Sequence, residues 1–76
     1  MNARTGAEIA VRVNGEPRTL PAGTTVAELV PDAVPDAEVR GVAVARNGEI
    51  VPRAEWATTA LAAGDAIEIV RPVQGG

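Results

Sequence analysis

The sequence contains no cysteine, no histidine and no lysine, and each absence removes a class of function. Without cysteine and histidine there is no disulfide, no thiolate metal site, no cysteine nucleophile and no histidine-dependent catalytic triad. Without lysine, the chain cannot form an isopeptide bond to a side chain of another copy of itself. Catalysis by cysteine or histidine side chains is therefore excluded, as are lysine-linked polymers of this chain.

A strong charge of one sign and a long apolar run are also missing. The net charge is −3, and all seven basic residues are arginines scattered along the chain, so there is no electrostatic footprint for nucleic acid. No apolar run approaches the ~18–20 residues of a membrane span. Residues 1–7 are polar and lack the apolar segment of a signal peptide. We therefore expect a cytoplasmic protein with neither nucleic acid nor membrane as a partner.

Aromatic residues are almost absent, since Trp56 is the only one. The core must therefore be built from valine, isoleucine, leucine and alanine, and we expect Trp56 to fill a gap in it rather than to anchor a ligand. The 76 residues suffice for one domain with one small core. We expect no deep substrate pocket of several hundred Å³ in a chain of this size.

The first strong pattern is a β-hairpin. Apolar residues occupy every second position in residues 8–13, which predicts a strand with one buried side. The Asn14-Gly15 pair that follows is typical of a type I′ turn, because both turn positions need a positive φ. Residues 16–20 then form the returning strand, and Pro17, which has no N–H to donate, marks it as an edge strand.

A helix is predicted after the hairpin. Thr25 and Glu28 have the spacing of a capping box, in which each side chain bonds the other residue's backbone N–H. Pro31 disfavours helical geometry in the residue before it and removes a donor, so we expect a short helix followed by a turn or loose helical turn over residues 32–36. One face of this helix is apolar, and it carries Val26, Leu29 and Val30.

The second half of the chain repeats the hairpin pattern without forming a sequence repeat. Residues 41–46 alternate as a strand, a second Asn-Gly pair at 47–48 predicts another type I′ turn, and residues 49–51 return. Residues 52–56 are expected to form a single helical or 3₁₀ turn. Residues 66–70 alternate again and are expected to form the last strand.

This order of elements predicts an α+β domain over residues 8–70, with a mixed sheet of four to five strands and one short helix on one face. The first and last strands have the clearest inward pattern, so we expect them to be central and, if they are adjacent, parallel. The other face of the sheet stays open. Ala43 and Ala45 on that face could form a small patch for a partner, or they could be ordinary exposed alanines.

Several polar residues invite a functional interpretation. Arg53 and Arg71 could steer an acidic groove of a partner toward this chain, although a solvated arginine is the more common case. Asp65 follows Gly64 and is expected to be a turn residue. On sequence alone, both interpretations of the two arginines stay open.

The end of the chain carries its most distinctive chemistry. We expect residues 71–76 to form a flexible tail and residues 1–7 a disordered extension. Gly75 and Gly76 have no Cβ, so they could enter a channel too narrow for other residues. The six tail residues reach about 20 Å when extended. A C-terminal carboxylate is ionised and a poor electrophile, so it would need activation by a partner, for example as an adenylate. The alternative is a simple frayed terminus.

The residues taken together resemble a known family, the ubiquitin-like β-grasp sulfur carriers of thiamine biosynthesis. The resemblance covers nearly everything from Ile9 onward. Its most specific parts are the Val-Pro-Arg-x-Glu-Trp block and the Val-Gln-Gly-Gly end. The segments that carry it are Val13–Glu16, Gly23–Leu29, Asn47–Arg53, Glu55–Ala57, Gly64–Val70 and Val73–Gly76.

The resemblance implies a mechanism centred on Gly76. A ubiquitin-activating-like adenylyltransferase would adenylate its carboxylate with ATP, and sulfur that originates from cysteine would convert it to a thiocarboxylate. A thiazole synthase would then take the sulfur for the thiazole ring of thiamine. Val73, Gln74 and Gly75 would give the tail access to the partner's active site. The chain itself would be no enzyme and would bind no cofactor, since ATP and its metal belong to the adenylyltransferase.

Three alternatives stay open at this point. The chain could carry sulfur for molybdopterin or another sulfur metabolite. It could be a ubiquitin-like modifier that forms amide bonds to proteins. It could also be a non-covalent binding module, for which the two terminal glycines would be dispensable.

Overall fold

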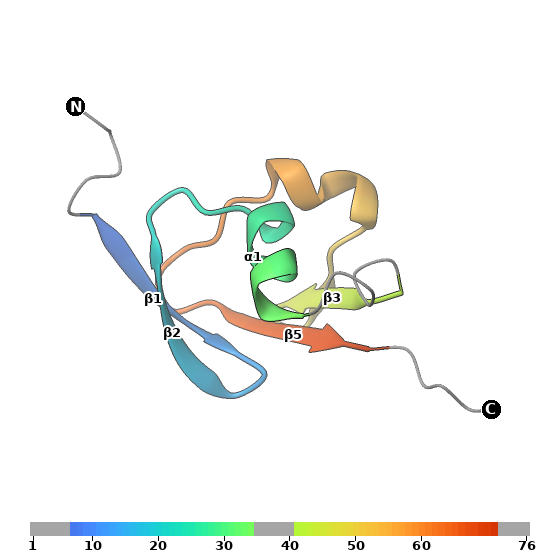
Figure 1. Cartoon of the computed structure of the whole chain (residues 1–76), viewed down its shortest axis with the longest axis horizontal. Coiled ribbons are helices and arrows are strands. Elements are labelled where there is room, and N and C mark those ends of the chain that lie inside the picture. Colours follow the sequence, from blue (N-terminus) through green and yellow to red (C-terminus); the bar gives the residue numbers. More distant parts are fainter. Residues whose placement is uncertain (1–6, 35–40, 72–76) are drawn as a thin grey trace.

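The computed structural model describes residues 7–34 and 41–71, which fold into a five-stranded mixed sheet with one α-helix and one 3₁₀ helix on the same side of it (Figure 1). The strand order is β2-β1-β5-β3-β4. The elements in chain order are β1 (Glu8–Val13), β2 (Glu16–Pro21), α1 (Val26–Ala33), β3 (Ala43–Arg46), β4 (Glu49–Ile50), the 3₁₀ helix η1 (Arg53–Thr58) and β5 (Ala66–Val70).

The sheet is organised around its two central strands. β1 and β5 are parallel neighbours, with Val13 opposite Ile67, while β2 pairs with β1 and β3 with β5 in antiparallel fashion. The first and last strands are adjacent, and the predictions that they are central and that adjacency would make them parallel are confirmed. So is the edge position of the strand that contains Pro17.

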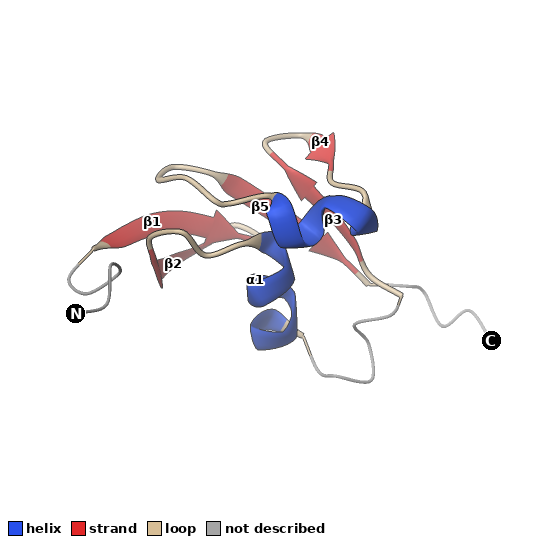
Figure 2. Cartoon of the chain, turned by 90° about the horizontal axis from the view of Figure 1, so that it is seen from above, coloured by secondary structure: helices blue, strands red, loops and turns tan. Residues whose placement is uncertain are grey.

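The core lies between one face of the sheet and the helices, and it is almost entirely aliphatic (Figure 2). α1 presents its predicted apolar face to β5 and β3, which direct alternate residues toward it. Trp56 is 6% exposed, so its predicted packing role is confirmed. The side chains with the least exposure come from both layers: Leu29, Ile67, Val26, Val30 and Val44.

Both Asn-Gly pairs adopt the predicted turn conformation. Asn14 and Gly15 have φ of 52° and 85°, and Asn47 and Gly48 have φ of 52° and 86°. A Cβ built on either glycine meets no atom within 4 Å. The requirement for glycine is therefore the positive φ and not a close approach of neighbouring atoms.

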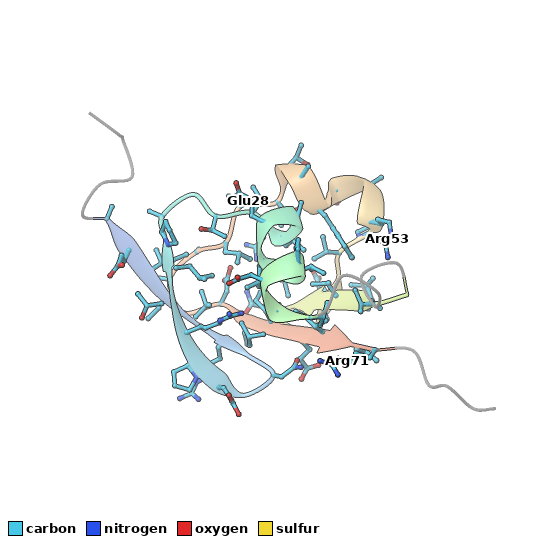
Figure 3. The ribbon with its side chains drawn as sticks, in the orientation of Figure 1. Glu28, Arg53 and Arg71 are labelled. Atoms are coloured by element: carbon cyan, nitrogen blue, oxygen red, sulfur yellow. The ribbon has the colours of Figure 1, made fainter. Side chains whose placement is uncertain are left out.

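The helix start agrees with the sequence prediction. Thr25 Oγ1 accepts from the Glu28 N–H at 3.2 Å, and Glu28 Oε1 accepts from the Thr25 N–H at 3.0 Å. Glu28 accordingly lies in the first turn of α1 (Figure 3). This capping box satisfies two N–H groups that would otherwise lack partners at the helix start.

The helix end differs from the prediction. α1 continues as a regular helix through Pro31 to Ala33, where we expected a turn or loose helical turn. Proline removes only the bond to the carbonyl four residues earlier, and the helix resumes at once, since the Val34 N–H bonds the Val30 carbonyl at 3.0 Å. Val34 is buried in the core, and its burial favours this extra half turn. Residues 35–36 lie outside the described residues.

Among the described residues, no helix combines the length and apolar character needed to cross a bilayer.

Candidate functional site

The predicted reactive end of the tail, Val73, Gln74, Gly75 and Gly76, lies outside the described residues. The structure describes the chain up to Arg71, which directly follows β5. The geometry that bears on the tail is therefore that of β5, the strand from which it leaves.

Ile69 is the last buried residue before the tail. Its exposed fraction is 5%, whereas Val70 is 59% exposed and Arg71 is also exposed. On one side β5 pairs with β3 as far as Val70, which lies opposite Ala43. The tail thus leaves from the end of a central strand that is held by the core up to Ile69.

On its other side, β5 is held partly by a side chain. β1 ends at Val13, and the side chain of Asn14 then takes over, because its Oδ1 accepts from the Ile69 N–H at 2.8 Å and its Nδ2 donates to the Ile69 carbonyl at 3.2 Å. Sequence reasoning assigned Asn14 to the turn alone and missed this contact. The available signal was the asparagine itself, because glycine would also fit the first turn position but has no side-chain amide to form hydrogen bonds.

The second turn asparagine binds the opposite end of β5. Asn47 Oδ1 accepts from the Ala66 N–H at 2.9 Å, and Asn47 Nδ2 donates to Asp65 Oδ1 at 2.9 Å. The two turns, which have the same backbone conformation, therefore contact β5 at its two ends.

Asp65 is a buried carboxylate at the start of β5. Burial alone would raise its pKa, but hydrogen bonds from the Ala62 N–H at 2.8 Å and from the Asn47 side chain, together with the Arg46 guanidinium at 3.1 Å, hold the pKa below its ordinary value. Asp65 was predicted to be a turn residue, and its side chain also anchors the segment that precedes β5. Within the described ranges no three histidine, cysteine, aspartate or glutamate side chains gather as a metal site would require.

The open face of the sheet carries an apolar patch that includes the last residue of β5. Ala43 is exposed and Ala45 is half-buried there, as predicted for residues that point away from the core. They lie opposite two large exposed residues on neighbouring strands, Val70 and Ile50, which is 69% exposed. Sequence reasoning missed both residues. The two-residue Asn47-Gly48 turn was the available signal for Ile50, because it sets the register of that hairpin, whereas the position of Val70 depends on pairing between strands that are distant in the sequence. We call these four residues the open-face patch.

The two arginines proposed for steering are not brought together. Arg53 lies over the Trp56 ring, with its guanidinium carbon 4.3 Å from the ring centroid, and it donates to the Val42 carbonyl at 3.4 Å. Arg71 lies at the end of β5. Figure 3 shows both at the end of the molecule toward which β5 runs.

An open groove of about 670 Å³ lies beside the root of the tail. Its lining includes Asn14, Ile69 and Arg71, together with Arg18 and Asp32, which form an ion pair at 3.1 Å. We expected no deep pocket of several hundred Å³. The volume exceeds that expectation, but the hollow is an open groove between the β1–β2 hairpin and the end of α1.

Comparisons with known proteins give consistent results. The model of the ThiS family matches residues 11–76. The solved structure of a thiamine biosynthesis protein (ThiS) from Geobacter metallireducens is similar, with a TM-score of 0.74 and 33% sequence identity over 90% of this chain and 100% of that one. A protein named thiazole synthase from Paramagnetospirillum magneticum is 44% identical over 64 residues, which are 84% of this chain.

That last match covers only 19% of the thiazole synthase, so the chain spans about a fifth of the length of this curated relative. The family match, in contrast, extends over most of the chain, and the solved structure matches over its whole length. The five-stranded mixed sheet with one α-helix is therefore the β-grasp fold that the sequence predicted, and the chain belongs to the ThiS family.

Proposed function

We propose that this chain is a sulfur carrier protein of thiamine biosynthesis that acts through the carboxylate of Gly76. The observation that carries the proposal is the family match, which extends to Gly76. The structure supports it, because β5 ends at Val70, an exposed residue of the open-face patch, and the exposed Arg71 follows it. The proposal requires that Gly76 be the last residue of the mature protein.

The chemistry proceeds in two displacements. A Gly76 carboxylate oxygen attacks the α-phosphorus of ATP, and pyrophosphate leaves with the electrons of the broken bond. A hydrosulfide equivalent derived from cysteine then attacks the acyl carbon of the adenylate, and AMP leaves, so that a thiocarboxylate remains. A thiazole synthase takes up this sulfur. The chain acts in the cytoplasm as a protein co-substrate and not as an enzyme.

The tail of this chain carries the reacting carboxylate and gives it access to the partner's active site. Its six residues reach about 20 Å when extended, enough to enter an active site that the globular part cannot enter. Val73 and Gln74 bridge the exposed end of β5 and the two glycines. Gly75 keeps the last part of the tail free of a Cβ, so that the acyl carbon of Gly76 can approach the nucleotide closely.

The open-face patch is the surface we assign to docking. Within the described ranges, Ile50 and Val70 are the large apolar residues that are exposed, since the others are buried or half-buried. Exposed apolar groups that gather beside a reactive segment fit a partner interface. Arg53 and Arg71 lie at the same end of the molecule and would steer an acidic partner (Figure 3).

Two partner enzymes follow from this chemistry. ATP and its metal are supplied by a ubiquitin-activating-like adenylyltransferase, so this chain binds no cofactor of its own. A thiazole synthase is the acceptor, and support for it comes from the relative of that name, which contains a segment 44% identical to this chain.

An ATP–pyrophosphate exchange assay with the cognate adenylyltransferase tests the proposal. The wild-type chain should support exchange, and a variant with one alanine added after Gly76 should not, although its urea denaturation curve matches that of the wild type. One alanine added before Met1 is the matched control and should leave exchange intact. Undiminished exchange by the C-terminally extended variant would contradict the proposal.

A second assay separates the thiamine pathway from other sulfur pathways. The thiocarboxylate form should support thiazole formation by the thiazole synthase. Sulfur transfer to molybdopterin, or an amide bond to a protein amine, with no thiazole formed, would assign the same terminus to a different acceptor.

A further inference from the structure

We infer that Asn14 is a positioning residue for the tail: its side chain anchors Ile69 and thereby fixes the point from which the tail leaves. This inference rests on the proposed function of the tail. Asn14 and Ile69 are 55 residues apart in the sequence, and their contact consists of two hydrogen bonds of 2.8 and 3.2 Å.

The contact replaces a missing stretch of β-ladder. β1 pairs with β5 only at Arg12–Ala66 and Val13–Ile67, because the chain then turns away at Asn14. The Asn14 backbone N–H still bonds the Ile67 carbonyl at 2.8 Å. Its side-chain amide then offers one donor and one acceptor to Ile69, as a peptide group of a longer β1 would.

The contact is made at Ile69, the last buried residue before the tail. Both backbone groups of Ile69 point to the Asn14 side, and alternate residues of a strand direct their backbone groups to opposite sides. Ile69 therefore depends on Asn14 for its backbone hydrogen bonds, and β3 cannot supply them. Val70 and Arg71, which follow Ile69, are exposed.

The functional consequence follows from chain entropy. With Asn14 in place, the tail starts from a fixed Ile69. Without the Asn14 side chain, only the pairing with β3 and the buried Ile69 side chain hold the end of β5. More backbone must then be ordered when the tail enters a partner. The loss should appear in KM for this chain and not in kcat, since the bound geometry is unchanged.

The molecule provides a matched control in Asn47. It occupies the same turn position with the same φ of 52° and also makes two side-chain hydrogen bonds, but at the end of β5 far from the tail. Replacement by glycine preserves both turns, because glycine adopts a positive φ without strain. Asn14→Gly and Asn47→Gly thus each remove two side-chain hydrogen bonds. Those of Asn14 both go to the Ile69 backbone, whereas those of Asn47 go to the Ala66 N–H and to the Asp65 side chain.

The first readout does not depend on function. Amide hydrogen exchange of the Ile69 N–H should accelerate in Asn14→Gly, while that of the Ala66 N–H stays as in the wild type. Asn47→Gly should show the reverse pattern. Equal protection of Ile69 in Asn14→Gly and in the wild type would overturn the anchoring role.

The second readout is pyrophosphate exchange, measured where denaturation curves show each variant to be fully folded. Asn14→Gly should raise KM by about 5- to 30-fold, the factor expected for ordering one more backbone residue, with kcat unchanged. Asn47→Gly should leave KM unchanged. Equal KM values for the two variants would overturn the positioning role.

Two further results keep the test decisive. If Asn14→Gly does not fold, the comparison moves to Asn14→Asp, which retains the acceptor for the Ile69 N–H but loses the donor to the Ile69 carbonyl. Its KM should lie above that of the wild type, and an unchanged KM would overturn the inference. If the wild-type chain itself supports no exchange, the proposed function fails, while hydrogen exchange still decides whether Asn14 anchors β5.

Discussion

Arg46 Nε lies 3.1 Å from Asp65 Oδ2, and this ion pair joins the end of β3 to the residue before β5. The Asp65 side chain is only 7% exposed and also accepts from the Ala62 N–H and the Asn47 side chain. The start of β5 is thus fixed by a charged network, as its end is fixed by Asn14.

This network makes stability depend on pH. The pKa of Asp65 lies below its ordinary value of 3.8. The unfolded chain therefore binds a proton more readily than the folded chain, so the stabilisation is complete above that ordinary value and is lost as the pH falls through the folded value. Asp65→Asn should lower the free energy of unfolding at pH 7 by about 1–3 kcal/mol.

Urea denaturation at pH 7 and at several values below pH 4 measures both effects. Asp65→Asn should show a smaller loss of stability on acidification than the wild type. Glu68→Gln, which removes an exposed carboxylate from the same region of the chain, is the matched control. An identical pH dependence in Asp65→Asn and the wild type would mean that the network does not stabilise the fold.

Trp56 should be the most sensitive core position. Its indole N–H donates to the Val51 carbonyl at 3.0 Å, and its ring is buried. Trp56→Ala should destabilise the domain by about 3–5 kcal/mol, and Trp56→Phe, which leaves the Val51 carbonyl without that donor, by about 1–3 kcal/mol. Thermal and urea unfolding give both values.

The Arg53 contact with the same ring should matter far less. Arg53→Ala removes a cation–π contact at an exposed side chain, which contributes about 0.5–1 kcal/mol. A loss in Arg53→Ala as large as that in Trp56→Phe would contradict this ranking.

The open-face patch should be sensitive to charge. Ile50→Asp places a carboxylate on an exposed site, so stability should change little, but binding to the adenylyltransferase should weaken by at least about 1–2 kcal/mol. Ala10→Asp is the matched control, because Ala10 is exposed on β1, two strands away from β3. Calorimetric titration compares the two, and equal losses would show that the patch is not the docking surface.

Gly75 should tolerate no side chain. Gly75→Ala places a Cβ next to the reacting carboxylate, and a displacement of about 1 Å there lowers the rate of pyrophosphate exchange by about 100-fold. Thr19→Ala, at an exposed position on β2, should exchange as the wild type does. Full activity of Gly75→Ala would remove the argument for a narrow channel.

The sequence predicted those features that a few neighbouring residues determine. The alternation in β1, the two Asn-Gly turns and the Thr25–Glu28 capping box all depend on contacts within four residues or fewer, and each is present. The predicted end of α1 at Pro31 was wrong. The preference of proline against a helix is local, whereas the burial of Val34, which favours a longer helix, depends on the packed core.

The rest of the candidate site depends on contacts between distant residues. The bonds from Asn14 to Ile69 and the register that places Val70 beside Ala43 exist only once the sheet is assembled. No local pattern encodes which residue of β5 lies beyond the end of β1. The family resemblance predicted the fold and the reactive terminus, but the anchors that hold β5 required the structure.

The most direct test of the central claim is the intact mass of this protein purified from its own host under thiamine limitation, with fragmentation to localise any change. We expect a population whose mass exceeds that of the unmodified chain by the replacement of one oxygen with one sulfur, localised to Gly76. Alkylation of the thiocarboxylate should remove that population. A terminus that is never sulfurated, or one found only in an amide bond to another protein, would contradict the account.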